Sequence, residues 1–206
     1  MYLKICFLGC ALLCWTVLIA QYFLMIQNRV VSIPETSLRF FSFFTILTNI
    51  LVAIVFTANY FKSKKGFKFF VNPQTQTEVG VYIFIVGFVY NLILRFIWKP
   101  IGLQQIVDEF LHLIIPIGYI MYWFYYVNKA TISWKSIYVW LLYPLIYICT
   151  VLFLGSLSTF YPYPFINATA LGYTIVLRNA FLLTLFFGLV SLLFVCVAKY
   201  SVKKQL

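Results

Sequence analysis

Three polar residues in one apolar segment could supply a nucleophile. Ser42, Thr45 and Asn49 interrupt a run of large apolar side chains. At about 100° per residue they form one helical stripe, which predicts that they face the interior of a helix bundle. Ser and Thr hydroxyls become nucleophiles when a base lies beside them. The alternative interpretation is hydrogen bonding between membrane helices, in which Ser, Thr and Asn often take part.

A second segment holds the groups that could act as that base. His112 is the only histidine of the chain, and Asp108 and Glu109 precede it by four and three residues. Either carboxylate can therefore share its helix face. A carboxylate beside an imidazole fixes the ring tautomer and raises its basicity, so we predict that Asp108 orients His112. The alternative is a histidine that only hydrogen-bonds at a helix interface.

A third segment predicts either a cover for such a site or an anchor at the membrane surface. The run Tyr161-Pro-Tyr-Pro-Phe165 contains two prolines, which favour a stiff, extended chain. Its tyrosines are equally typical of an interfacial aromatic belt. Arg178 and Asn179 follow in the next apolar run. With Asn49 they are the candidates for stabilising an oxyanion, and Tyr161 is a candidate substrate contact. Arg178 has two other possible roles: an ion pair with Asp108 or Glu109, or binding of an anionic head group.

The composition shows which kind of element must position these groups. Of the 206 residues 64% are apolar and 9% are charged, with a mean hydropathy of +0.99. A soluble domain of this size buries only about 70% of its surface, so it could not hide so much apolar area. This excludes a soluble enzyme, a disordered chain and a disulfide-stapled secreted domain. The net charge of +11 does not indicate nucleic-acid binding, because most lysines lie in short loops beside apolar runs.

Six apolar runs are long enough for helices that cross a bilayer, which takes about 20 residues. They are too long and too continuously apolar for barrel strands. We therefore predict an all-α, polytopic membrane protein, with residues 1–206 as one six-helix domain. The predicted spans are 5–26, 38–61, 78–98, 106–127, 135–157 and 173–198.

The charges of the loops predict the orientation of the chain in a plasma or inner membrane. Loops and termini on one side carry ten lysines and a net charge of +9, against +2 on the other side. By the positive-inside rule both termini are cytoplasmic. Ser42 and His112 then lie at similar depth near the outer face, so we expect the second and fourth spans to be neighbours. A cysteine-accessibility map should place loop 62–77 in the cytoplasm, and an outer location would contradict this topology.

Three motifs in segments 39–49, 111–116 and 161–165 resemble the androgen-induced-gene family of six-span membrane proteins, also called FAR-17a-type, and its bacterial relatives. The resemblance covers essentially the whole chain in number and spacing of spans. It implies cytoplasmic termini and threonine-dependent hydrolysis of fatty acid esters of hydroxy fatty acids. It also implies a nucleophile in the second span and a histidine in the fourth.

The family residues carry over to this chain with one departure. His112 matches the family histidine. Ser42 follows one basic and two large apolar residues and so takes the place of the family threonine. Serine keeps an Oγ nucleophile but differs from the family residue, and Thr45, one turn deeper, is the second candidate.

The leading hypothesis from the sequence is a lipid-ester hydrolase in which Ser42 attacks, His112 acts as base and Asp108 orients it. The alternative is a non-catalytic six-helix protein that binds or moves a lipid or small solute. The sequence has no inverted repeat of the kind found in transporters and no lysine within a span that could bind retinal. Its single histidine cannot supply the paired histidine ligands of a haem carrier. One histidine and two adjacent carboxylates are an incomplete zinc site, so we expect no metal and no cofactor. The partners expected are the bilayer and an amphiphilic small molecule, and the oligomeric state is left open.

Overall fold

The computed structural model describes residues 2–61 and 65–203, and every regular element within these ranges is a helix. Three of the ten lysines counted above for the orientation, Lys62, Lys64 and Lys204, lie outside the described residues. Five helical segments are long and apolar enough to cross a bilayer: Tyr2–Gln27, Pro73–Ile97, Leu103–Tyr126, Ser136–Ser158 and Ala168–Lys203. A sixth candidate span is a pair of helices with a sharp bend between them. The all-α, multi-pass fold is confirmed, and the chain is an integral membrane protein.

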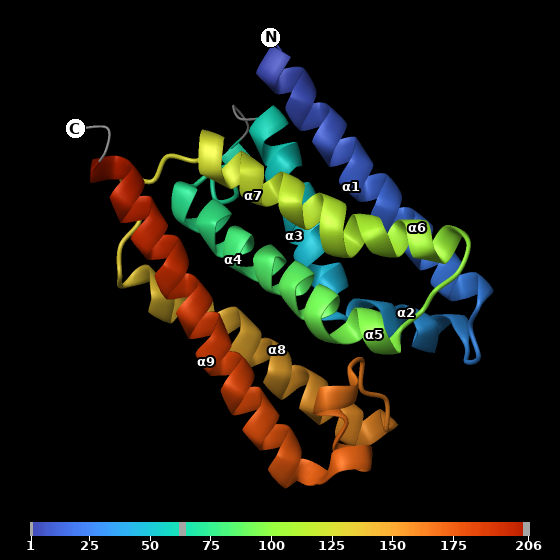
Figure 1. The fold of residues 1–206 in the computed structure, drawn as a ribbon. Helices are drawn as coiled ribbons and strands as arrows, with labels where there is room; N and C mark the ends of the chain where they lie inside the picture. The colour runs from blue at the N-terminus through green and yellow to red at the C-terminus, as the bar shows by residue number, and fades with distance from the viewer. Residues whose placement is uncertain (1, 62–64, 204–206) are drawn as a thin grey trace. The chain divides into compact units, whose positions relative to one another are not determined.

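The chain divides into two compact units, Met1–Asn128 and Lys129–Leu206, each of which is described by itself. The single domain 1–206 stays a prediction. The first unit contains α1 (Tyr2–Gln27), α2 (Ile33–Phe41), α3 (Phe44–Tyr60), η1 (Lys65–Phe67), α4 (Pro73–Val89), η2 (Tyr90–Leu94), α5 (Arg95–Ile97), α6 (Leu103–Glu109), η3 (Phe110–Ile114) and α7 (Ile115–Tyr126). The second unit contains α8 (Ser136–Ser158), η4 (Pro164–Ile166) and α9 (Ala168–Lys203), as Figure 1 shows.

The second predicted span, 38–61, is not one helix. Helix α2 ends at Phe41 and α3 begins at Phe44, with a bend of 72° between them. Ser42 lies at the break, and its hydroxyl donates to the carbonyl of Leu38 at 2.8 Å, while Phe43 is extended. Serine side chains can bond to nearby backbone and so compete with a continuous helix. The predicted stripe of Ser42, Thr45 and Asn49 is therefore wrong for Ser42, which is not part of α3.

The local sequence explains where α2, the helix before this break, begins. Ser32 caps α2 by accepting the backbone N–H of Glu35 at 3.4 Å. Pro34 occupies the first turn, where its missing N–H costs no hydrogen bond. The pattern Ser-x-x-Glu is that of a capping box. A short helix therefore starts independently at residue 33, before the predicted span.

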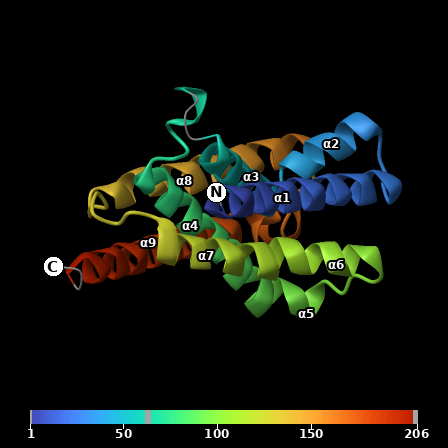
Figure 2. The same ribbon diagram turned by 90° about the horizontal axis from the view of Figure 1, so that it is seen from above.

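Helix α3 contacts both α1 and α7 within the first unit. The indole N–H of Trp15 on α1 donates to the hydroxyl of Thr57 at 3.2 Å. The ring of Phe56 meets those of Tyr119 and Tyr122 on α7, with centroids 5.6 and 5.2 Å apart. Figure 2 shows α1 and α3 running side by side. This packing brings the polar face of α3 toward the segment that carries the histidine.

Helices α4 and α7 are joined by hydrogen bonds at the end of the unit where α4 begins. The hydroxyls of Tyr119 and Tyr122 donate to the main-chain and side-chain oxygens of Gln76, each at 2.9 Å. The indole of Trp123 donates to Thr77 at 2.9 Å. These buried groups pair with one another, so this end of the unit has a structural role.

The second unit is a helical hairpin of α8 and α9 closed by segment 159–167. Val151, Ile166 and Val176 form its buried core, and Tyr161 and Phe165 of the connecting segment pack against it. The segment predicted as a lid or belt thus packs against its own hairpin. Gly155 on α8 makes room for it, because a Cβ there would overlap the ring of Tyr161.

Gly155→Ala should therefore destabilise the second unit. The added methyl group forces the Tyr161 ring to move, and overpacking of this kind costs about 1–3 kcal/mol. Thermal unfolding in detergent should show a lowered midpoint, partly restored in the double variant Gly155→Ala, Tyr161→Ala. Gly188→Ala on α9 is the matched control, because a Cβ there meets no atom within 4 Å. An equal loss in the control would contradict this packing.

Candidate functional site

Two π-helical turns face each other within the first unit. In η2 the N–H of Arg95 donates to the carbonyl of Tyr90, and in η3 the N–H of Ile115 donates to the carbonyl of Phe110. Each bond spans five residues instead of four. Single π-helical turns are rare and often occur at functional sites. They mark the part of the unit in which main-chain geometry departs most from a regular helix.

These turns leave carbonyl groups that two asparagines satisfy. Leu111 loses its usual donor because the N–H of Ile115 bonds further back. His112 loses its donor because Pro116, four residues later, has no N–H. Asn49 Nδ2 lies 3.2 Å from the carbonyl oxygen of Leu111, and Asn91 Nδ2 lies 3.1 Å from that of His112.

The two asparagines act in the same way from two different elements, α3 and η2. Asn49 Nδ2 also donates to the carbonyl of Thr45 at 2.9 Å, four residues earlier on its own helix. Asn91 Nδ2 also donates to the carbonyl of Gly87 at 2.8 Å. Each amide nitrogen therefore ties its own helix to the turn that carries His112. With both N–H groups in use, Asn49 has no donor left for an oxyanion.

The predicted neighbourhood of the second and fourth spans is confirmed by the bond between Asn49 and Leu111. Asn49 bridges the main chain of Thr45, in the first turn of α3, and that of the residue before His112. Thr45 and Asn49 are buried. Two buried oxygens of this stretch, Asn49 Oδ1 and Thr48 Oγ1, have no hydrogen-bond partner among the described residues.

The bonds of His112 define its tautomer. The side chain is buried, and Nδ1 lies 2.9 Å from the main-chain oxygen of Asp108. A carbonyl oxygen only accepts, so in the neutral ring Nδ1 carries the proton and Nε2 keeps its lone pair. The ring stacks on that of Tyr90, with centroids 3.8 Å apart and planes 12° apart. His112 is thus held with a basic nitrogen in a buried environment.

The carboxylate of Asp108 has other partners than the imidazole. It accepts the hydroxyl of Tyr90 at 2.9 Å and the amide of Gln104 at 3.3 Å. Gln104 also donates to Gln21 on α1 at 2.8 Å. Asp108 therefore contacts His112 through its main chain, and its side chain holds Tyr90. The sequence interpretation missed Tyr90, Gln104 and Gln21. Gln21 was a visible signal, because it is a polar residue within the apolar run 5–26.

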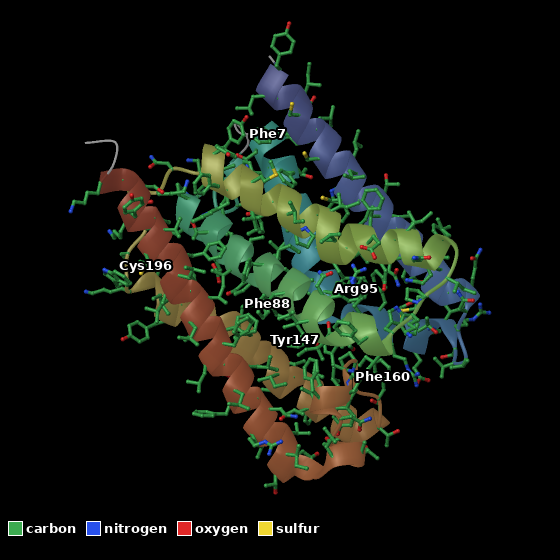
Figure 3. The ribbon with its side chains drawn as sticks, in the orientation of Figure 1. Phe7, Phe88, Arg95, Tyr147, Phe160 and Cys196 are labelled. Carbon is green, nitrogen blue, oxygen red and sulfur yellow. The ribbon has the colours of Figure 1, made fainter. Side chains whose placement is uncertain are left out.

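Glu109 is paired with an arginine. Both guanidinium ends of Arg95 donate to its carboxylate, at 2.6 and 2.7 Å, and Arg95 Nε donates to Asn91 at 3.0 Å. Figure 3 labels Arg95, the first residue of α5. The guanidinium carbon also lies 5.3 Å from the centroid of the Tyr90 ring. This ion pair joins the residue after η2 to the residue before η3, so Glu109 is part of the scaffold around His112.

The remaining predicted site residues, Tyr161, Arg178 and Asn179, belong to the second unit. The amide of Asn179 donates to the carbonyl of Phe165 at 2.8 Å and so holds the connecting segment. Arg178 is exposed. Burial and the neighbouring hydroxyl of Tyr173 keep the pKa of Tyr161 above its ordinary value. Their place in one site with His112 stays a prediction.

The comparisons add no assignment to this geometry. No family model, no curated protein and no solved structure matches the chain. Within residues 2–61 and 65–203, no group of three or more His, Cys, Asp or Glu side chains is arranged to hold a metal ion. The candidate site is therefore defined by its own residues.

The role assigned to Asn91 leads to a double-mutant prediction. Asn91→Leu leaves the buried carbonyl of His112 without a donor, which costs about 1–3 kcal/mol. Pro116→Ala restores a main-chain N–H four residues after His112. We expect Asn91→Leu to lower the unfolding free energy less in the Pro116→Ala background than in the native chain. Equal losses in the two backgrounds would show that Asn91 does not act through this carbonyl.

Proposed function

We propose that this membrane protein hydrolyses an ester of an amphiphilic lipid, with Nε2 of His112 as the general base. The observation that carries the proposal is the bond from His112 Nδ1 to the main-chain oxygen of Asp108. It leaves Nε2 as the acceptor of a buried imidazole. Ionisable side chains within membrane spans are costly and are functional candidates by default. The resemblance to the androgen-induced-gene family supports the same reaction.

The geometry favours Thr45 over Ser42 as the nucleophile. The hydroxyl of Ser42 donates to a carbonyl of α2, on the far side of the break. Thr45 is buried in the first turn of α3, and Asn49 ties its main chain to Leu111. Helical side chains lean toward the N-terminus, and His112 bonds to the residue one turn before it. These contacts support a similar level for Thr45 and the imidazole, which is part of the proposal.

The proposed reaction needs only these side chains and water. Oγ of the nucleophile attacks the acyl carbon while its proton passes to Nε2 of His112. The imidazolium then gives this proton to the leaving alkoxide, which departs as the alcohol. Water, deprotonated by Nε2, then attacks the acyl-enzyme. The bond to Oγ breaks, the imidazolium returns its proton to Oγ, and the fatty acid is released. The face of the Tyr90 ring would stabilise the transient imidazolium.

The non-catalytic alternative also has an observation in its favour. Asn49 and Asn179, two of the predicted oxyanion donors, use their amides to hold main-chain carbonyls. A protein that only binds a lipid would use polar residues in this structural way. The cytoplasmic location of both termini is part of the proposal and rests on the charge distribution of the loops.

A covalent probe separates the two functions. An alkyl fluorophosphonate phosphorylates an activated hydroxyl and releases fluoride. We expect mass spectrometry of the purified protein in detergent to locate the adduct on Thr45, with no adduct in His112→Gln. A protein that keeps its thermal midpoint, binds a fatty-acyl ester in native mass spectrometry and stays unlabelled would support the binding function.

A further inference from the structure

Helix α2 adds little to the membrane crossing made by α3. At 1.5 Å per residue the 17 residues of α3 measure about 26 Å, close to the roughly 30 Å of the hydrocarbon core. The nine residues of α2 measure about 14 Å, of which the 72° bend leaves about 4 Å along the axis of α3. The bend therefore lies near one boundary of the hydrocarbon core, and α2 belongs to the boundary region.

One face of α2 is fixed to the protein. Thr36 and Phe40 are buried. The ring of Phe40 lies 5.1 Å from that of Tyr22 on α1, edge to face, and the Tyr22 hydroxyl shares a 2.8 Å hydrogen bond with Ser37. These contacts determine which way the rest of the helix surface points.

The surface of α2 includes an apolar strip and, beside it, a charged strip. Leu38 and Phe41 are 72% and 53% exposed and lie about 60° apart around the helix. Glu35 and Arg39 lie about 60° and 100° from Leu38, on the side away from Phe41, and form an ion pair at 2.6 Å. Apolar and charged strips side by side are typical of a helix in the membrane interface.

We propose that α2 is an interfacial helix whose apolar strip, Leu38 and Phe41, contacts the acyl chains of one leaflet while Glu35 and Arg39 contact the head groups. The partner is lipid because α2 cannot leave the bilayer surface. Only five residues separate it from the end of α1, and two separate it from α3. Both neighbours are helices of membrane-spanning segments. An apolar strip held at this level meets acyl chains first.

This placement also suggests how a substrate enters, a step that rests on the proposed function. The apolar strip ends at Phe41, directly before the break at Ser42 and three residues from the first turn of α3. An amphiphile could thus move along the strip from the leaflet to Thr45 with its head group at the charged strip. The lipid contact itself does not depend on any catalytic activity.

Spin labelling tests the placement. Single cysteines at Glu35, Leu38 and Phe41 would be labelled in a variant whose five native cysteines are alanine, in nanodiscs of phosphatidylcholine and phosphatidylglycerol. Collision rates with oxygen report lipid, and those with a water-soluble nickel chelate report water. We expect oxygen to dominate at Leu38 and Phe41 and nickel to dominate at Glu35. A label at Ile19, exposed in the middle of α1, is the control for the hydrocarbon core.

Two outcomes would overturn the inference. If all three α2 positions match Ile19, with nickel excluded throughout, α2 lies within the hydrocarbon core. If nickel dominates at Leu38 and Phe41 as well, the helix lies in water. Loss of ester hydrolysis, by contrast, would count against the proposed function and would leave the collision pattern unchanged.

Discussion

His112→Gln is expected to lower the rate of fatty-acyl ester hydrolysis by about 10²–10⁴-fold, the usual contribution of a positioned base. Glutamine keeps a side-chain N–H that can donate to the main-chain oxygen of Asp108, now bonded by Nδ1 at 2.9 Å. It has no basic nitrogen, so it cannot take the proton of the nucleophile. The measurement is kcat and KM of the purified protein in detergent with a long-chain acyl ester. The loss should fall on kcat, because proton transfer belongs to the chemical step.

The control for this variant lies in the same turn. Ile114, two residues after His112, is exposed on the surface of η3. Ile114→Ala should keep the native rate, because this side chain points away from the imidazole cluster. Both variants should unfold at nearly the native temperature. A His112→Gln protein with native kcat would show that the imidazole is structural and that the hydrolase proposal is wrong for this site.

The membrane character of the fold was accessible from the sequence because it depends on composition. Long apolar runs leave few alternatives once water is excluded as the solvent. The pairing of the second and fourth spans could also be predicted from the sequence, since polar side chains within a membrane form hydrogen bonds with other polar groups. Asn49 and the residue before His112 confirm it.

The details of the site were not accessible because they depend on the main chain. A hydrogen bond that shifts from four residues to five, as at Tyr90 and Phe110, changes no residue type. Without the turn in η3, the carbonyl of Leu111 would keep its usual donor, so its bond to Asn49 could not be foreseen. The amide of Asn49 was therefore predicted to be available for an oxyanion, whereas it is bound to the backbone. For the carbonyl of His112 the sequence did carry a signal, since Pro116 has no N–H.

The break of the second span had a weak local signal that the apolar pattern concealed. Hydropathy treats residues 38–61 as one run, and it does not register a serine that bonds its own backbone. The capping box at Ser32 marked a helix start six residues before that run. With the break, Ser42 lies between the two helices and Thr45 lies in α3, so the choice of nucleophile becomes a question of geometry.

Thr45→Val is expected to be as damaging as His112→Gln, and the double variant little worse, because a nucleophile and its base act as one unit. Valine has nearly the shape of threonine and fills the same buried space, so the fold should persist. Thr45→Ser should recover much of the rate, because it restores Oγ. Ser42→Ala should keep most of the rate, because the Ser42 hydroxyl donates to the carbonyl of Leu38.

The pattern of these variants identifies the nucleophile or removes it. If Ser42→Ala is inactive while Thr45→Val is active, the nucleophile is Ser42 at the break, and α3 positions only the asparagine. If both variants keep kcat and KM, no hydroxyl of this segment attacks the ester. The polar face of α3 would then serve the packing that Asn49 already shows, and lipid binding without catalysis would be the better function for this cluster.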